Sequence, residues 1–288
     1  MNMSTVFLNN AFLPPKQALI SPMDRGFLFG EGIYEVIPSY QGTFIGLQLH
    51  LNRLFNGLKA LDIQNPYSRD KWLSLCQQLV EQNDGDNLAV YIQVTRGSST
   101  IRHHGYNNDL TATIYAFTFS IPTAPLADKR QTNAYTVSTH QDLRWQRCNI
   151  KSTSLLGNVM HFQHGIDEGN KETILFNSNQ ELTEASSSNV FIVKDRTIIT
   201  PPLDHQILPG VTRYILLEIL NKYSQYKVEE RKVSHQEVIR ADEVWLTSST
   251  KEVAPVIAIE NKPVALGEIG DVWLTAQSLF SQYKYLYL

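Results

Sequence analysis

The sequence predicts an α+β protein of two domains, each with a mixed sheet and packed helices. Segments with strand character alternate irregularly with segments of helical periodicity, and hairpin signals are frequent. A doubly wound parallel sheet would need regular alternation instead. A connector that contains Pro122 and Pro125 also divides the chain. We therefore expect a smaller N-terminal domain at residues 1–120, an interdomain linker at 121–130 and a larger C-terminal domain at 131–288.

The N-terminal part combines hairpins with two helices. Leucines that recur at helical spacing from Leu47 to Leu61 predict an amphipathic helix, with Arg53 beside its apolar face. Ser68 predicts the N-cap of the next helix. In chain order, the expected elements are strands on either side of the Asn9-Asn10 turn, a loop at 24–32, a hairpin at 33–40 and 43–47, helices at 47–61 and 69–82, and strands at 88–95 and 111–120.

The C-terminal part mixes strands and helices as well. Ser234-His235-Gln236-Glu237 has the form of a capping box and predicts the start of a short helix. A longer helix follows Gly210, with Val211, Tyr214 and Ile215 among its inward residues. The remaining expected elements are strands at 133–139, 173–177, 188–193, 197–200, 243–247 and 256–260, a helix after residue 154, and a helical tail from about Gly267.

Composition narrows the class of protein. The 288 residues carry a net charge of −3 and a pI near 6.2, which gives no basic surface for a nucleic-acid backbone. No apolar run is long enough for a membrane span, and no secretory signal is recognisable, so we expect a cytoplasmic protein. Cys76 and Cys148 stand outside any C-x-x-C motif, which disfavours a zinc site or a disulfide framework. We expect no metal.

Two stretches carry the candidate chemistry. In the first, Lys151 stands between an apolar residue and small hydroxyl residues that lead into an apolar helical pattern at Leu155, Val159, Phe162 and Ile166. This places the lysine at a loop-to-helix junction, partly shielded from water. The second stretch, Glu181–Val193, joins carboxylates to a serine-rich turn and an apolar strand. Taken alone, each has an ordinary interpretation, a solvated lysine and a solvated turn acid.

Together the two stretches resemble the signatures of the fold-type IV pyridoxal-phosphate enzymes. This family includes D-amino-acid aminotransferases, branched-chain aminotransferases, aminodeoxychorismate lyases and certain amine transaminases. Further matching blocks follow in the expected order at Asp24–Gly26, Phe29–Glu35, Ile207–Arg213 and Glu243–Pro255. The resemblance implies a homodimer whose protomers hold the cofactor between a small and a larger, cofactor-binding domain.

The resemblance implies pyridoxal 5′-phosphate as the cofactor and assigns its contacts. Lys151 matches the lysine that forms a Schiff base with the aldehyde and, once freed by substrate, moves the proton of Cα. Glu184 matches the acid that faces the pyridine nitrogen and keeps it protonated. Arg53 matches the arginine that the family places at the phosphate. The alternative interpretation of Arg53 is an exposed helix arginine without a binding role. The residues implied at the phosphate are Arg53, the helix start at Gly210, Val211 and Thr212, and Ser248 and Ser249.

Substrate choice depends on three further positions. The D-amino-acid aminotransferases have a tyrosine after the early glycine loop, and an arginine and a histidine two apart in a later loop. Here these resemble Tyr34, Arg102 and His104, a set suited to binding an α-carboxylate. The spacer before Arg102 is one residue longer than expected, so Ile101 and His103 are the alternative pair. An exposed basic loop without a binding role is a second alternative.

The resemblance therefore implies a transaminase that moves the amino group of a D-amino acid, such as D-alanine, to a 2-oxo acid, such as 2-oxoglutarate, by a ping-pong route. Within the family, an (R)-amine transaminase, a branched-chain L-amino-acid transaminase and an aminodeoxychorismate lyase share Lys151 and Glu184 and remain open. A non-catalytic binding protein on the same fold is a remote alternative. A non-catalytic protein would not require an amine, an acid and phosphate-binding residues together, so this combination favours an enzyme.

Overall fold

The chain forms two compact units in the computed structural model, which describes residues 4–107 and 109–287. The first unit comprises the residues up to Thr123, together with Ile150–Leu155 and Tyr287. The second comprises Ala124–Asn149 and Leu156–Leu286. Ile150–Leu155 thus joins the first unit although it lies within the range 131–288. The domain boundaries expected from the sequence stay a prediction.

The first unit is built on a six-stranded sheet with the order β2-β1-β6-β5-β3-β4. Its described strand pairs are all antiparallel, so the mixed pairing expected of both sheets is absent from these pairs. The strands are β1 (Val6–Leu8), β2 (Ala11–Leu13), β3 (Gly32–Tyr40), β4 (Thr43–Phe44), β5 (Asn87–Thr95) and β6 (Thr113–Ser120).

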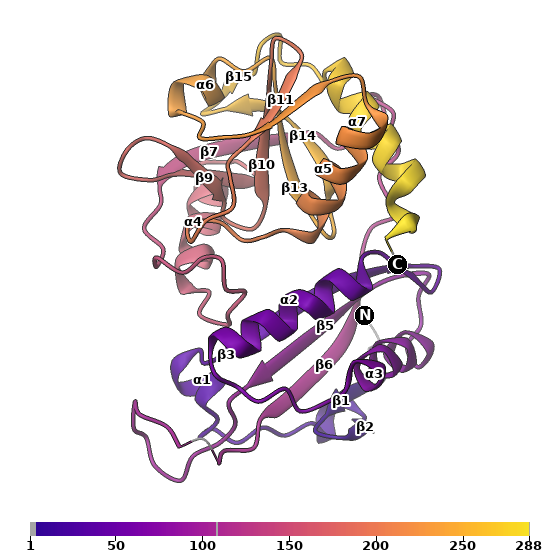
Figure 1. The fold of residues 1–288 in the computed structure, drawn as a ribbon, viewed down its shortest axis with the longest axis vertical. Coiled ribbons are helices and arrows are strands. Elements are labelled where there is room, and N and C mark those ends of the chain that lie inside the picture. Colours follow the sequence, from indigo (N-terminus) through magenta and orange to yellow (C-terminus); the bar gives the residue numbers. More distant parts are fainter. Residues whose placement is uncertain (1–3, 108, 288) are drawn as a thin grey trace. The chain divides into compact units, whose positions relative to one another are not determined.

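Helices α2 (Leu47–Ala60) and α3 (Arg69–Glu81) cover one face of this sheet (Figure 1). The predicted leucine periodicity is the cause, because Leu51, Leu54 and Leu58 are buried in the core that α2 shares with the sheet. The predicted cap is confirmed, since the Ser68 side chain accepts a hydrogen bond from the backbone N–H of Lys71.

A short helix, α1 (Arg25–Phe29), replaces part of the loop expected at residues 24–32. Asp24 caps it by accepting a hydrogen bond from the Gly26 N–H at 2.8 Å. Gly30 ends it with φ 66°, a left-handed conformation that favours glycine. Two 3₁₀ turns are also present: η1 (Pro15–Gln17) in the first unit and η2 (Lys284–Leu286) in the second.

The second unit contains a nine-stranded sheet with the order β12-β11-β10-β13-β14-β7-β8-β9, and β15 pairs with β14. This sheet is mixed, as expected: β11/β12, β14/β7 and β7/β8 are parallel pairs. The strands are β7 (Tyr135–Gln141), β8 (Glu172–Phe176), β9 (Leu182–Ala185), β10 (Asn189–Lys194), β11 (Thr197–Thr200), β12 (Lys227–Glu230), β13 (Glu243–Ser248), β14 (Glu252–Ile259) and β15 (Lys262–Pro263).

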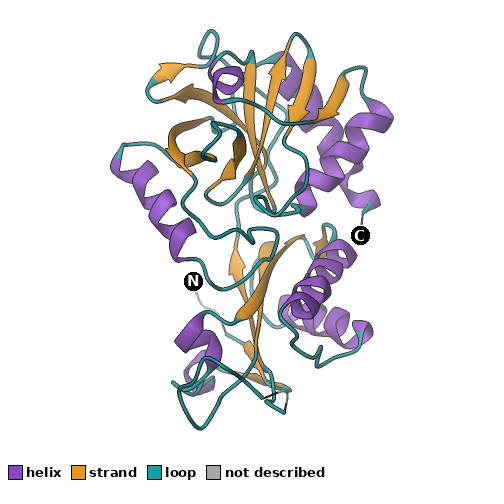
Figure 2. Ribbon diagram, turned by 60° about the vertical axis from the view of Figure 1, so that its left-hand side comes forward, coloured by secondary structure: helices purple, strands orange, loops and turns teal. Residues whose placement is uncertain are grey.

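Both faces of the second sheet are covered. Helices α5 (Val211–Tyr223) and α7 (Asp271–Tyr283) lie against each other and pack on β13 and β14 (Figure 2). A second core contains Val238 of the short helix α6 (His235–Ile239), and the predicted capping box that begins α6 is confirmed. Because the sheet is buried on both sides, β8 and β10 are buried over almost their whole length, with apolar runs at 174–176 and 190–193 that lack alternation.

Helices α5 and α4 (Leu156–Asp167) both expose large side chains. Tyr214 was expected to point inward, and this is wrong: its side chain is 47% exposed because it shares a face of α5 with Glu218, away from the sheet. Helix α4 follows Lys151 as predicted. Its apolar residues Val159 and Ile166 are nevertheless exposed in the chain.

Within residues 4–107 and 109–287, no helix combines the length and apolarity that crossing a membrane requires. The same residues contain no group of three or more His, Cys, Asp or Glu side chains that could hold a metal ion.

Candidate functional site

Lys151 lies on an extended segment that runs beside the start of β3. The Tyr34 N–H donates a hydrogen bond to the Lys151 carbonyl at 3.0 Å, and the Thr153 N–H donates to the Gly32 carbonyl at 2.9 Å. These bonds fix the segment Ile150–Leu155 to the first sheet. The Lys151 ammonium is half-buried and lies 4.0 Å from the centre of the Tyr34 ring. A cation above an aromatic face is stabilised there without a carboxylate partner.

Arg53 points its guanidinium fork at a buried carboxylate. Its Nε and Nη2 donate to Oε1 and Oε2 of Glu35 at 2.7 and 2.8 Å. The His50 ring, one turn earlier on α2, donates from Nδ1 to Oε2 of Glu35 at 2.7 Å. Burial favours the neutral carboxyl, but Arg53 and His50 outweigh burial and hold the pKa of Glu35 well below its ordinary value. Arg53 is therefore oriented by Glu35, and its contact with a phosphate stays a prediction.

Tyr34 has a second aromatic neighbour besides the lysine. Its ring stacks on that of Tyr91 with centres 5.7 Å apart. Burial raises the pKa of Tyr91 to about 12, so this phenol remains a hydrogen-bond donor at neutral pH. Lys151, Tyr34 and Tyr91 thus form one cluster at the first sheet, where the predicted lysine and the predicted substrate tyrosine come together.

Arg102 and His104 gather on one aromatic ring at the end of α1. The Arg102 guanidinium carbon lies 5.2 Å, and the His104 ring centre 5.4 Å, from the centre of the Phe29 ring. In the alternative pair, Ile101 is 65% exposed and the His103 Nδ1 donates to a neighbouring backbone carbonyl. Arg102 and His104 thus share a contact with one aromatic ring, and their role in binding a carboxylate stays a prediction.

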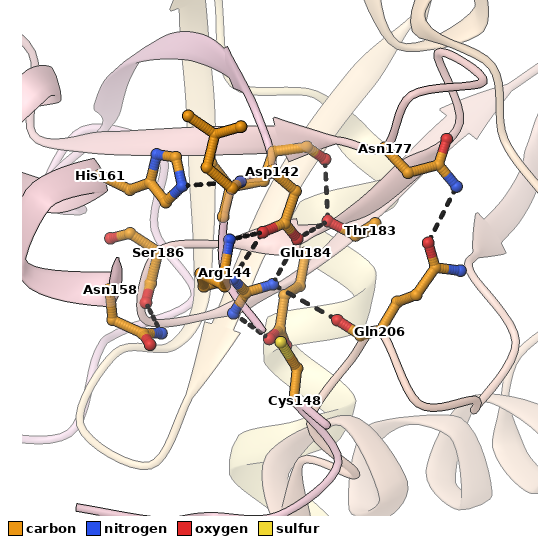
Figure 3. A network of polar contacts seen from close by, with 12 residues as sticks. Asp142, Arg144, Cys148, Asn158, His161, Asn177, Thr183, Glu184, Ser186 and Gln206 are labelled. Atoms are coloured by element: carbon orange, nitrogen blue, oxygen red, sulfur yellow. Dashed lines mark hydrogen bonds and ion pairs between the residues drawn. The ribbon is translucent and has the colours of Figure 1, made fainter. Parts of the chain in front are cut away.

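Glu184 lies on β9 in the second unit, next to Arg144 (Figure 3), and both of its carboxylate oxygens accept hydrogen bonds. Oε1 accepts a hydrogen bond from Nη1 of Arg144 at 2.6 Å. Oε2 accepts from the Leu208 N–H at 3.0 Å and from the Asn189 side chain at 3.2 Å. Burial raises the pKa of Glu184 to about 7, although Arg144 and the Leu208 N–H oppose the rise. The alternative of a solvated turn acid is wrong, because the residue is 5% exposed.

Arg144 is held between two carboxylates, as the close view in Figure 3 shows. Its Nε and Nη2 donate to the two oxygens of Asp142 at 3.0 and 2.7 Å, while Nη1 serves Glu184. Asp142 is fixed in turn by the Thr183 hydroxyl, which donates to Oδ2 at 2.8 Å. Burial raises the pKa of Asp142, but the contacts of Arg144 and Thr183 outweigh burial and keep this pKa below its ordinary value.

The start of α5 joins this network through Asn189. Besides contacting Glu184, the Asn189 amide donates to the Leu208 carbonyl at 2.9 Å. A Cβ on Gly210 would lie 2.0 Å from Oδ1 of Asn189, so a larger residue at this position would force the Asn189 side chain to move. Helix α5 begins without a side-chain cap, which leaves the N–H groups of its first turn, those of Val211 and Thr212 among them, facing outward along the helix axis.

Ser248 is the last residue of β13, the strand that pairs with β10, and Ser249 follows it. In the register of β10 and β13, Asn189 lies opposite Thr247, so the serines come directly after a residue beside the start of α5. Both serines are half-buried. The Thr247 hydroxyl is buried and has no hydrogen-bond partner among the described residues. Uncapped N–H groups, hydroxyls and an orphaned buried oxygen are together suited to the oxygens of a phosphate.

The predicted residues therefore form two groups. Lys151 and Tyr34 lie together in the first unit, which also contains Arg53, Arg102 and His104, whereas Glu184, Val211, Thr212, Ser248 and Ser249 lie in the second. Sequence reasoning missed the side chains that orient these groups: Glu35 and His50 at Arg53, and Asp142 and Arg144 at Glu184. The only signal for the second pair was an acid and an arginine two residues apart, shortly before the lysine.

Comparisons with known proteins show the family of the chain. The family model described as amino-transferase class IV matches residues 32–259. The D-alanine aminotransferase of Staphylococcus aureus (strain COL) is 34% identical over 282 residues, 98% of either chain. The D-alanine aminotransferase of Bacillus licheniformis is 35% identical over 273 residues, 95% of this chain and 94% of the relative.

Solved structures extend the likeness to the fold. The branched-chain aminotransferase of the archaeon Thermoproteus uzoniensis with norvaline superimposes with a TM-score of 0.87 at 18% identity, covering 99% of this chain and 96% of that chain. The Escherichia coli branched-chain enzyme gives a TM-score of 0.89 at 18% identity, covering 98% and 94%. At these identities the likeness shows the shared fold, that of the fold-type IV aminotransferases.

Proposed function

We propose that this chain, which belongs to the class IV aminotransferase family, is a D-amino-acid transaminase. It would move the amino group of a D-amino acid such as D-alanine to a 2-oxo acid such as 2-oxoglutarate. The observation that carries the substrate class is the likeness, at 34–35% identity over nearly the whole length, to relatives named D-alanine aminotransferase. The reaction is expected to follow a ping-pong route, in which the 2-oxo product leaves before the 2-oxo acceptor binds.

Pyridoxal 5′-phosphate is the proposed cofactor, and the residues present fit it. The orphaned Thr247 hydroxyl and the uncapped N–H groups at the start of α5 are hydrogen-bond donors that the oxygens of a phosphate would satisfy. Val211, Thr212, Ser248 and Ser249 would supply N–H and hydroxyl donors. Arg53 would supply positive charge, with its fork oriented by Glu35.

When bound, pyridoxal phosphate supplies an aldehyde for amines and a ring that accepts electrons. Lys151 is the amine that would hold the aldehyde, and its Nζ would carry the proton between the substrate Cα and the cofactor. Tyr34 would keep this ammonium in place through its ring. Glu184 would face the ring nitrogen and keep a proton there. Arg144 and the Leu208 N–H orient that carboxylate.

Arg102 and His104 are the proposed recognition pair for the substrate carboxylate. Both side chains are exposed and converge on the Phe29 ring. A guanidinium beside an imidazole would bind a carboxylate through charge-assisted hydrogen bonds. The same pair would accept the carboxylate of a 2-oxo acid in the second half of the reaction.

Separate incubation of the purified enzyme with D-alanine and with L-alanine, with 2-oxoglutarate as acceptor and pyruvate as readout, tests the substrate class. We expect turnover of D-alanine only. L-only or equal turnover would refute the proposal and favour a branched-chain type of enzyme. Turnover of an added (R)-amine without that of D-alanine would instead identify an amine transaminase, and breakdown of added aminodeoxychorismate would identify a lyase.

Replacement of the lysine tests the cofactor assignment. Lys151→Ala should remove turnover together with the visible absorption of the bound cofactor. Lys59→Ala, an exposed lysine of α2, is the matched control and should keep both. Purified wild-type protein that stays colourless and inert with added pyridoxal phosphate would favour the non-catalytic alternative.

A cytoplasmic homodimer is the proposed state of the protein. The apolar residues that α4 exposes, Leu156, Val159 and Met160 at 73, 59 and 65%, suit coverage by another protein surface. Light scattering on the eluting protein measures the assembly directly, and a monomer would contradict this part of the proposal. Cell fractionation tests the location.

A further inference from the structure

One buried arginine holds the backbone of the loop that carries Arg102 and His104. Arg25, the first residue of α1, is 3% exposed. Its Nη1 donates to the carbonyls of His103 at 2.7 Å and Gly105 at 3.3 Å. Its Nη2 donates to the carbonyl of His104 at 2.8 Å. A single guanidinium thus binds three neighbouring carbonyls of one loop.

The direction of this guanidinium is itself fixed. The Arg25 Nε donates to Oε2 of Glu31 at 2.5 Å, and the other oxygen of Glu31 accepts from Nε of Arg96 at 2.5 Å. The Arg25 charge is therefore paired, and its remaining N–H groups are aimed at the loop. A lysine has no planar fork and would not reach the three carbonyls from one position.

Helix α1 also provides the surface on which the loop's side chains lie. The Phe29 ring is within 4.8 Å of the Arg25 guanidinium carbon, on the same short helix. The side chains of Arg102 and His104 meet this ring from the loop. Arg25 fixes the loop's backbone, and Phe29 lies beneath the two side chains whose direction depends on that backbone.

We propose that Arg25 is a positioning residue for substrate recognition, which holds the 102–105 loop so that Arg102 and His104 face the carboxylate of the substrate. This inference rests on the proposed function. Arg25 does not touch the substrate and acts through the loop. The four loop residues are exposed, so the hydrogen bonds from Arg25, here called the Arg25 clamp, are the main contacts that order their backbone. Without this clamp, the binding-competent conformation of the loop would be only fractionally populated.

The loop conformation can be measured without any enzymatic assay. Trypsin cleaves after Arg102, which is exposed but lies in the segment held by Arg25. Arg25→Met should raise the rate of cleavage there about tenfold, because proteolysis requires local opening of the chain. Arg213→Met is the matched control: Arg213 is also a buried arginine bonded to a carbonyl and a glutamate, in the second unit. Its cleavage at Arg102 should match the wild type.

Kinetics then test recognition. Arg25→Met should raise KM for both D-alanine and 2-oxoglutarate about 10- to 100-fold, since the apparent affinity falls with the competent fraction. The dissociation constant of pyridoxal phosphate should change less than about threefold, because Arg25 has no contact with the proposed cofactor residues. The KM values of Arg25→Lys should lie between those of the wild type and those of Arg25→Met. In an Arg102→Ala background, Arg25→Met should lose less than the sum of the two single losses, since Arg25 then acts on the carboxylate through His104 alone.

Different outcomes refute the role proposed for Arg25 and the proposed function of the enzyme. Unchanged cleavage in Arg25→Met overturns the proposal, and so does faster cleavage with unaltered KM values or an additive loss in the double variant. A wild-type enzyme inactive on D-amino acids refutes the proposed function, while the cleavage comparison still measures the clamp. If Arg25→Met does not fold, Glu31→Gln serves instead, since it loosens the guanidinium without removing it, and should speed cleavage to a smaller extent.

Discussion

Glu184→Gln in cofactor-free protein should remove a pH dependence of stability that the wild type has. The pKa of Glu184 is raised from 4.5 to about 7 by burial, so the folded protein holds this proton more tightly than the unfolded chain does. Unfolding between these pH values releases protons, and the free energy of unfolding falls as the pH rises. A rise of that size in pKa corresponds to about 3 kcal/mol, fully present below pH 4.5 and lost as the pH passes 7.

Urea unfolding of both proteins at intervals between pH 4.5 and 8 measures this contribution. The glutamine does not titrate, so the wild-type free energy minus the variant free energy should fall by about 3 kcal/mol across the window. Other groups, such as the buried His50 and His161, whose pKa values burial lowers, titrate in both proteins and cancel in the difference. A flat difference would show that Glu184 is ionised throughout, and would refute the reasoning from burial.

Three further changes probe the same network and one helix cap. Arg144→Met should lower the free energy of unfolding by about 3–5 kcal/mol in urea titrations, because it leaves two buried carboxylates without their shared cation; a loss under about 1 kcal/mol would contradict this. Gly210→Ala should displace Asn189 and weaken pyridoxal phosphate binding in a fluorescence titration, whereas wild-type affinity would show that the phosphate lies elsewhere. Ser234→Ala should cost about 1 kcal/mol of stability through loss of the capping box, and calorimetry would reveal an unaltered melting temperature if the cap contributed nothing.

Elements with a local signal were predictable. The helix at 47–60 has leucines at helical spacing, and the helices at 69–81 and 235–239 begin with serine caps, so sequence and structure agree closely there. The missed elements lack such signals. α1 has five residues, too few for periodicity, although Asp24 was a recognisable cap. β9 reads Leu-Thr-Glu-Ala, and its two polar side chains are buried with partners distant in sequence, among them Asp142 for Thr183 and Arg144 for Glu184.

Contacts distant in sequence were beyond prediction from the chain alone. The segment at 150–155 bonds to the edge of β3, over a hundred residues earlier, and neither stretch shows this pairing by composition. The residues that orient the site have the same character. Arg25 meets a loop 78 residues away, and Arg144 meets Glu184 at a separation of 40. Single side chains with ordinary neighbours become informative only once the fold brings their partners close.

Glu35 and Glu184 are both buried carboxylates bonded to an arginine, but they differ in the positive charge that faces them, and this difference bears on the cofactor. Arg53 gives its Nε and Nη2 to Glu35, the His50 ring adds a further donor, and together they outweigh burial and lower the pKa of Glu35. Arg144 divides its guanidinium between Asp142 and Glu184. Two carboxylates against one guanidinium leave this group one positive charge short, which is why burial still raises the pKa of Glu184. A protonated ring nitrogen at Glu184 would supply the missing charge. The carboxylate would then stay ionised at neutral pH, and the proton would remain on the ring, where the proposed chemistry needs it.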